Sequence, residues 1–300
     1  MSLTPSLPPS VTLRDAAPGY PILEVSHPAA AARVALHGGH LMEWTPAGQA
    51  PVLYLSPKAV FREGKAIRGG VPVCWPWFGD HPAGSDFPAH GIARNRFWAL
   101  ESATENAEGV RLSLTLANDD ATRKFWPHAF ELRLELAIGR TLEMTLTMRH
   151  LGDVPAVFGA ALHSYFSVGD IRTVSVQGLE EVPYFTETGP PREQGEHTQH
   201  GEILIDHEVD RQYHAAPELH LLDPALWREI VITSSGSTAT VVWNPWVEKA
   251  ARLPDLPDTD YRNFLCLETA CLATSSRLEL QPGGTHTLSA AVRCQPLETH

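Results

Sequence analysis

Two side chains that can transfer protons lie in stretches that are otherwise apolar. Glu268 is the only charged residue of NFLCLETACL (263–272), and His163 lies within VFGAALHSYFSV (157–168). A buried carboxylate is costly unless it is paired, which favours a functional role for Glu268 over a structural ion pair or a hydrogen-bonded acid. His163 taken alone is more simply interpreted as a core histidine that a neighbour satisfies.

A third stretch, RGGVPVCWPWFGDHPAGSDFPAHGIARN (68–95), places cations beside flat apolar rings. It is too rich in Trp, Phe, Pro and Gly for a helix and too interrupted for a single strand. His90 lies here in a loop, where binding residues concentrate. The rings could lie in the core while the arginines are solvated, or both could contact a ligand. The residues alone favour neither interpretation. Asp210, in EVDRQYH, belongs by itself to an ordinary polar turn.

The formal net charge of the 300-residue chain is −12. This charge argues against a general affinity for nucleic acid or anionic membrane, which requires a basic face. An anionic small molecule is compatible with it only if the cations are local. Five cations do gather around the aromatic stretch, namely Arg62, Lys65, Arg68, Arg94 and Arg96.

The four cysteines contain no CxxC pair and lie mostly among apolar residues, which predicts buried free thiols in a reducing compartment. The N-terminus shows no signal-peptide pattern, and no run approaches the ~18 apolar residues of a membrane span, so we expect a cytoplasmic protein. Neither a Cys/His cluster at zinc spacing nor a glycine-rich nucleotide motif is present, so we expect no metal and no cofactor.

The elements that must position these residues are strands. Apolar and polar residues alternate in VRLSLTLA (110–117), FELRLELAI (130–138) and LEMTLTMRH (142–150), with a GRT turn between the last two. Such alternation predicts half-buried antiparallel strands, and its recurrence along the chain predicts an all-β sandwich or barrel. We expect one domain over residues 1–300, with 1–10 as a loose leader and 252–263 as an exposed loop.

The sequence resembles the aldose 1-epimerase (galactose mutarotase-like) superfamily, and within it the branch of D-hexose-6-phosphate mutarotases, or glucose-6-phosphate 1-epimerases. The resemblance spans roughly 30–295 in the order of the family's motifs. It implies an antiparallel β-supersandwich with a shallow sugar cleft. The motifs that carry it are GKAIRGGVPVCWPWFGDHP, PAHGIARNRFW, ALHSYFSVGDI, VDRQYH, VVWNPWVEKA and NFLCLETACL.

The resemblance also implies roles for individual residues. His163 falls on the catalytic acid of the family and Glu268 on its catalytic base, while His90 and Asp210 fall on substrate-contacting positions. Arg68 and Arg94 match arginines that surround the phosphate. Arg96, at a position that varies in the family pattern, is a further candidate for the phosphate, and the rings of Trp75 and Phe78 would offer apolar surface to the sugar.

The implied reaction needs only an acid and a base. To interconvert the α and β anomers, a base removes the proton of the C1 hydroxyl while an acid protonates the ring oxygen, and the freed aldehyde turns before the ring closes. Burial raises the proton affinity of a carboxylate, and a histidine titrates near neutral pH, so Glu268 and His163 suit these tasks.

Two other functions stay open at this point. One is a mutarotase of unphosphorylated hexoses, which a site without converging arginines would favour. The other is a non-catalytic carbohydrate-binding protein, since fold does not fix function. The presence of both Glu268 and His163 argues against the second. The expected partner is a small sugar phosphate and neither nucleic acid nor membrane, and we expect the chain to act as a monomer.

Overall fold

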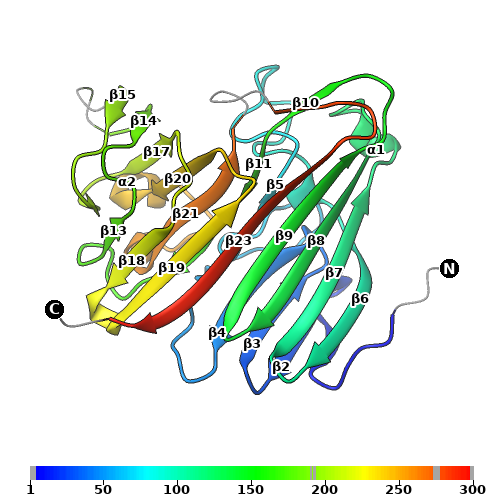
Figure 1. The fold of residues 1–300 in the computed structure, drawn as a ribbon, viewed down its shortest axis with the longest axis horizontal. Coiled ribbons are helices and arrows are strands. Elements are labelled where there is room, and N and C mark those ends of the chain that lie inside the picture. Colours follow the sequence, from blue (N-terminus) through cyan, green and yellow to red (C-terminus); the bar gives the residue numbers. More distant parts are fainter. Residues whose placement is uncertain (1–4, 190, 192–193, 273–277, 298–300) are drawn as a thin grey trace.

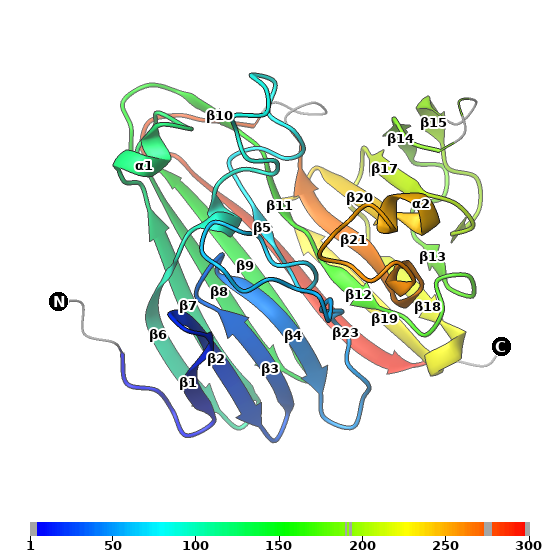
Figure 2. The ribbon, with the colours of Figure 1, turned by 180° about the vertical axis from the view of Figure 1, so that it is seen from behind.

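The computed structural model describes residues 5–189, 191, 194–272 and 278–297. The chain folds into two layers of antiparallel sheet, and Figures 1 and 2 show them from opposite sides. A nine-stranded sheet forms one layer. An eight-stranded sheet and a four-stranded sheet form the other, and both are in contact with the nine-stranded sheet. The expected all-β antiparallel sandwich is therefore confirmed.

The nine-stranded sheet contains the strands whose alternation is clearest in the sequence. Its apolar residues, such as Leu134 and Leu146, face the other layer and are fully buried. In order across the sheet, its strands are β16 (Ile203–Leu204), β13 (Ser175–Gln177), β18 (Leu219–Asp223), β19 (Arg228–Ser235), β23 (Thr285–Pro296), β9 (Thr141–His150), β8 (Phe130–Gly139), β7 (Gly109–Ala117) and β6 (Ala99–Asn106).

The second layer carries the candidate site residues. Its four-stranded sheet is a meander of β1 (Val11–Ala17), β2 (Tyr20–His27), β3 (Ala30–Ala35) and β4 (His40–Pro46). Its eight-stranded sheet runs through β15 (Gly195–Thr198), β14 (Pro183–Thr186), β17 (Val209–Tyr213), β20 (Ala239–Asn244), β21 (Phe264–Cys271), β11 (Ala160–Leu162) and β5 (Val73–Cys74), and β12 (Tyr165–Ser167) also pairs with β21.

Helices are short and lie at the rim of the sandwich. The described part of the chain has two α-helices, α1 (Asp120–Arg123) and α2 (Trp246–Ala250). It also has three 3-10 turns, η1 (Ala93–Asn95), η3 (Pro224–Leu226) and η4 (Asp260–Asn263). Asp119 caps α1 with two reciprocal hydrogen bonds. Its side chain accepts from the backbone N–H of Thr122, and the Thr122 hydroxyl accepts from the backbone N–H of Asp119. Figure 2 shows α2 and the chain that follows it lying over β20 and β21.

The stretch 157–168 is not the single strand that its apolar character predicts. It divides into β10 (Ala156–Phe158), β11 and β12, and β10 leaves the eight-stranded sheet to pair with β22 (Leu278–Leu280). The second interruption falls at His163, where the N–H of Ser164 donates to the carbonyl of Leu162 at 3.0 Å. This bond closes a three-residue turn around His163, so the backbone bends at a candidate catalytic residue.

The loop 252–263 is also not simply exposed. Leu256 is fully buried, and the Asp255 side chain retains only 5% of its accessible surface. In the segment expected to be a loose leader, residues 1–4 lie outside the described residues, while Leu7 packs against the core. The described cysteines are free, as expected, and Cys74, Cys266 and Cys271 are buried.

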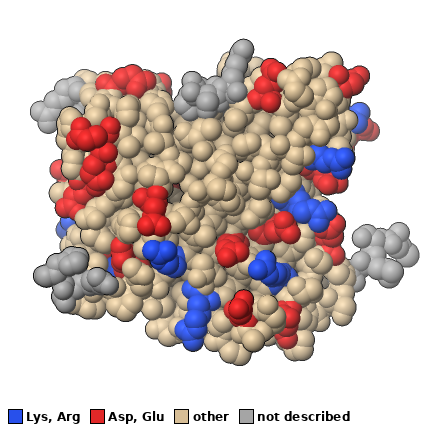
Figure 3. Space-filling model, in the orientation of Figure 1, with Lys and Arg blue, Asp and Glu red and all other residues tan. Residues whose placement is uncertain are grey.

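The charges are distributed over the surface in small groups. On the described part of the face in Figure 3, Lys and Arg side chains alternate with Asp and Glu and form no continuous basic surface. No described helix is long and apolar enough to cross a bilayer.

Candidate active site

The site lies on the outer face of the eight-stranded sheet, where β11 and β12 meet β21. Leu162 pairs with Thr269 and Tyr165 with Cys266, so His163 and Glu268 lie opposite each other between these pairs. Residues opposite each other in an antiparallel ladder point to the same face. The structure therefore brings the two proton-transferring residues together, although they are far apart in the sequence.

His163 and Glu268 contact each other directly. The Nε2 atom of His163 lies 3.3 Å from Oε1 of Glu268, and the two residues are only 6% and 2% exposed. The second nitrogen of His163, Nδ1, and the second oxygen of Glu268, Oε2, are buried without a hydrogen-bond partner among the described residues. Buried polar atoms normally find partners, so two orphaned atoms on one acid–base pair indicate a place for ligand hydroxyls.

Burial favours the neutral form of both members of the pair. It raises the pKa of Glu268 well above its usual range, and the nearby carboxylate of Asp210 adds to that effect. It lowers the pKa of His163 well below its usual range, and His90, Arg94 and Arg68 add to that effect. In the empty site, burial therefore favours the neutral pair over the charged pair, and so favours the shared proton on Glu268 over His163.

The stretch 68–95 brings His90 and Arg94 to the pair. His90 adopts a left-handed backbone conformation with φ of 59°, which is uncommon for a residue other than glycine and marks strain at a functional site. Its ring lies 5.6 Å from that of His163 and 4.8 Å from that of Phe78. Burial, with the charges of Arg94 and Arg68, lowers its pKa to about 3, so His90 is neutral.

Gly91 and Gly70 explain why this stretch needs its glycines. Gly91 has a positive φ, and a Cβ atom there would lie 2.0 Å from the carbonyl oxygen of Trp75. At Gly70 a Cβ atom would lie 2.3 Å from the carbonyl oxygen of Leu41. Any side chain at either position would displace backbone beside the site.

The two arginines lie close to the pair but have different partners. Nη2 of Arg94 donates to the carbonyl of Ala89 at 2.7 Å, and its buried Nε has no partner among the described residues. Arg68 donates through Nε to Asp255 at 3.1 Å and through Nη1 to the hydroxyl of Tyr165 at 3.0 Å. Both positive charges act on His90 and His163, which places them at the same site.

Asp210 lies on β17, which β20 separates from β21, and its charge acts on Glu268. It pairs with Trp243 of β20, which pairs in turn with Cys266 of β21. Burial and the carboxylate of Glu208 raise the pKa of Asp210 to about 6, against the opposing effect of Lys249. The Nζ of Lys249 lies 3.9 Å from Asp210 and 5.9 Å from the centre of the Trp243 ring.

One residue from the sequence analysis, Trp75, does not lie where it was expected. Trp75 cannot offer its ring to a sugar, because the ring is 2% exposed and packs against Trp126 and Phe130 in the core. The charge of Arg96 helps to lower the pKa of Asp119, the cap of α1, and a contact of Arg96 with the phosphate stays a prediction. Phe78, in contrast, is partly exposed and adjoins His90.

Sequence reasoning missed Tyr165, Trp243 and Asp255. The ring of Tyr165 is stacked on that of His163, with centroids 4.9 Å apart and an interplanar angle of 7°. The Trp243 ring meets both of them edge-on. An alternation of period two within 157–168 puts Tyr165 on the same face as His163 and could have identified it. Nothing in the sequence distinguishes Asp255 from the other acids of its loop.

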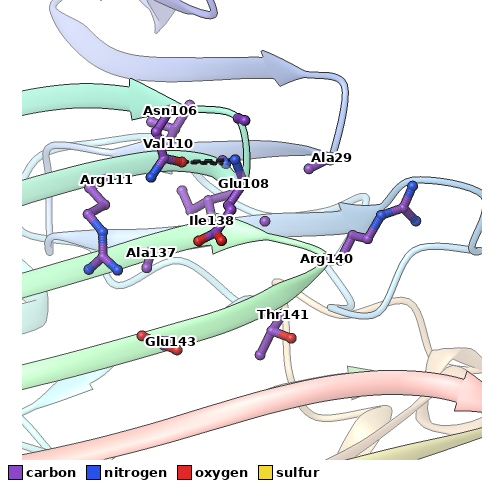
Figure 4. A pocket seen from close by; sticks show the side chains of 13 residues that line it. Ala29, Asn106, Glu108, Val110, Arg111, Ala137, Ile138, Arg140, Thr141 and Glu143 are labelled. Atoms are coloured by element: carbon purple, nitrogen blue, oxygen red, sulfur yellow. Dashed lines mark hydrogen bonds between the residues drawn. The ribbon is translucent and has the colours of Figure 1, made fainter.

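A groove of the surface lies elsewhere. It is a groove of about 460 Å³ beside the hairpin turns of the nine-stranded sheet, and its polar lining includes Glu108, Arg111, Arg140 and Glu143 (Figure 4). It shares no residue with the His163–Glu268 site. Among the described residues, no three His, Cys, Asp or Glu side chains converge as metal ligands.

Comparisons with known proteins agree with this geometry. A protein of Escherichia coli named "Putative glucose-6-phosphate 1-epimerase" is 39% identical over 258 residues, which cover 86% of this chain and 85% of that protein. A protein of the same name from Cenchrus ciliaris is 36% identical over 84% of this chain and 78% of its own length.

Solved structures show the same fold. A crystal structure of a mutarotase homologue from Salmonella typhimurium superposes with a TM-score of 0.88 at 33% identity, over 97% of this chain and 96% of that one. The galactose 1-epimerase of Lactobacillus acidophilus superposes with a TM-score of 0.73 at 15% identity, over 98% of this chain and 100% of that one, and supports the fold alone. The sequence profile of the aldose 1-epimerases matches residues 21–293, and the chain therefore belongs to the aldose 1-epimerase family.

Proposed function

We propose that this protein is an isomerase that interconverts the α and β anomers of a hexose 6-phosphate. The observation that carries the proposal is the buried contact between His163 and Glu268, with an unpartnered polar atom on each residue. An anomer exchange needs one group that accepts a proton and one that donates a proton on the same sugar ring. A binding protein has no need of such a pair.

We assign Glu268 as the base for the C1 hydroxyl and His163 as the acid for the ring oxygen. This assignment requires the shared proton on His163, whereas burial favours it on Glu268 in the empty site. The proton count of the pair is the same in both arrangements. Sugar hydroxyls that bond to Oε2 of Glu268 would stabilise the carboxylate, as Arg94 already does, and thereby favour the active arrangement.

The remaining residues bind the sugar in this proposal. The Asp210 carboxylate accepts hydrogen bonds from the sugar hydroxyls, and the neutral His90 ring donates to or accepts from them. Phe78 contacts the apolar face of the sugar. Arg94 and Arg68 attract the phosphate, because a guanidinium forms strong charge-assisted hydrogen bonds with phosphate oxygens. The relatives named as glucose-6-phosphate 1-epimerases support glucose 6-phosphate as the substrate.

The test is a measurement of anomer exchange by NMR on glucose 6-phosphate and on glucose. We expect the purified protein to accelerate exchange of the phosphorylated sugar more than that of glucose. Equal acceleration of both sugars would make it a mutarotase of unphosphorylated aldoses, and acceleration of neither would make it a binding protein.

A further inference from the structure

The orientation of the His163 ring is not fixed by a hydrogen bond at its outer nitrogen. Catalytic histidines are commonly oriented by a third group that bonds to the nitrogen opposite the reacting one. Here Nε2 contacts Glu268, and Nδ1 has no partner among the described residues. The plane of the ring is therefore set by its contact with Glu268 and by packing, and its parallel neighbour is Tyr165, with centroids 4.9 Å apart.

Tyr165 is itself held from both ends. Trp243 and Phe264 contact its ring, with centroids at 6.0 and 5.2 Å, and the side chain is 2% exposed. Its hydroxyl accepts a hydrogen bond from Nη1 of Arg68 at 3.0 Å. Among the described residues, this bond is the polar contact of the tyrosine side chain, and it ties the hydroxyl end of the ring to Arg68.

Arg68 is held in turn by Asp255. The carboxylate of Asp255 accepts from Nε of Arg68 at 3.1 Å and lies 3.5 Å from Nζ of Lys65, while its side chain is 5% exposed. The arginine lowers the pKa of Asp255 against the opposing effect of burial, so the carboxylate is charged. The carbonyl of Asp255 also accepts from the hydroxyl of Ser56 at 2.6 Å, and the N–H of Ser56 donates to the carbonyl of Arg68.

We propose that Asp255, Arg68 and Tyr165 form a positioning relay that sets the plane of the His163 ring. The relay begins in the loop 252–263 and ends at the acid–base pair. It assigns Arg68 a second task beside the attraction of phosphate, and it makes Asp255 and Tyr165 positioning residues for proton transfer. The predicted effect of the relay on turnover rests on the proposed function. The orientation of the His163 ring can be measured without any substrate.

The experiment compares three variants of the full chain. Tyr165→Phe keeps the ring and removes the hydroxyl, and Asp255→Asn keeps the shape and removes the charge that holds Arg68. Asp258→Asn is the matched control, because it makes the same chemical change at an exposed position of the same loop. The first measurement is the ¹⁵N spectrum of labelled histidine side chains, in which the signals of His163 are identified by their loss in His163→Asn.

The relay predicts that Tyr165→Phe and Asp255→Asn both shift the His163 signals, whereas Asp258→Asn leaves them in place. The second measurement is anomer exchange on glucose, which has no phosphate for Arg68 to bind. Because misplaced catalytic groups lose rate steeply, we expect kcat to fall about 10-fold in both relay variants, with little change in KM. The control should retain the wild-type kcat.

Two outcomes would overturn the relay. One is an unchanged His163 spectrum in Tyr165→Phe. This variant keeps the buried aromatic ring, so it should fold even if Asp255→Asn proves unstable. The other is a change confined to KM for glucose 6-phosphate, which would leave Arg68 with the phosphate alone. If the wild-type protein exchanges no sugar, the proposed function fails, and the His163 spectrum by itself decides the relay.

Discussion

Replacing Glu268 with Gln tests the proposed base with little disturbance of its surroundings. Gln has nearly the same shape, and its amide can donate to Nε2 of His163 across the 3.3 Å that separates the two residues. Burial already favours the neutral carboxyl in the empty site, so a neutral amide resembles the protein's own resting state. We therefore expect Glu268→Gln to fold normally.

The expected loss is that of a general base. Such groups contribute about 10²–10⁴-fold to a rate, which corresponds to about 2.7–5.4 kcal/mol at ~1.36 kcal/mol per factor of ten. The variant keeps the arginines, Asp210 and Phe78, so binding should be retained. The loss should consequently appear in kcat, with KM for glucose 6-phosphate close to the wild-type value.

The same variant makes a prediction about stability. The pKa of Glu268 is raised in the folded protein, so the stability that its neutral form provides is complete below the unfolded pKa, ordinarily about 4.5. That stability is lost as pH rises through the higher folded pKa. Gln does not titrate, so the Tm of Glu268→Gln should gain on that of the wild type as the pH is raised.

The assay is NMR exchange between anomer signals at equilibrium, with the uncatalysed exchange subtracted. Glu229→Gln is the matched control. Glu229 also contacts a histidine, His220, at 2.6 Å, but lies on β19 in the other sheet. It should retain the wild-type kcat. Turnover of Glu268→Gln near that of the wild type would show that Glu268 is structural and would refute the assignment.

Three further predictions follow from the same geometry. His163→Asn should reduce kcat by a comparable ~10²–10⁴-fold with an unchanged circular-dichroism spectrum, and retained turnover would exclude it as the acid. The pKa of Asp210 is about 6, so KM should rise as pH falls through 6, when the carboxyl is protonated, and Asp210→Asn should abolish this dependence in a KM–pH profile. Arg94→Ala should lower kcat/KM for glucose 6-phosphate by about 10- to 150-fold, the value of one hydrogen bond to a charged group, and should change glucose exchange far less; equal losses on both sugars would assign Arg94 to structure.

The sequence allowed the fold class and Glu268, one member of the candidate acid–base pair, to be predicted for a physical reason. Alternation with a period of two reports which face of a strand is buried, and it is strong in β7, β8 and β9 because one of their faces is solvated. Glu268 was recognisable because a single charge in an apolar strand is rare. That it meets His163 came from the family resemblance, since pairing between distant strands leaves no local signal.

The errors also have identifiable causes. An aromatic ring in a loop-like stretch has the same appearance in sequence whether it faces a ligand or the core, so the sequence did not show that Trp75 packs in the core whereas Phe78 adjoins His90. Arg94 lies within the 3-10 turn η1, and Arg96 is the first residue after it. Only the backbone directions at this point separate their side chains. Asp255 was overlooked because its burial depends on two cations from a distant segment, Lys65 and Arg68.

The burial of the His163–Glu268 pair is compatible with anomer exchange, because the reaction returns both residues to their starting state. Under the proposed mechanism, ring opening moves one proton from the sugar to Glu268 and another from His163 to the sugar. Ring closure on the other face returns both, so the pair ends each turnover in the state in which it began. No proton has to be exchanged with solvent, and an exposure of only 6% and 2% does not limit turnover. A hydrolase must in addition bring a water molecule to the reacting carbon in every cycle, whereas ring opening and closure by His163 and Glu268 consume none.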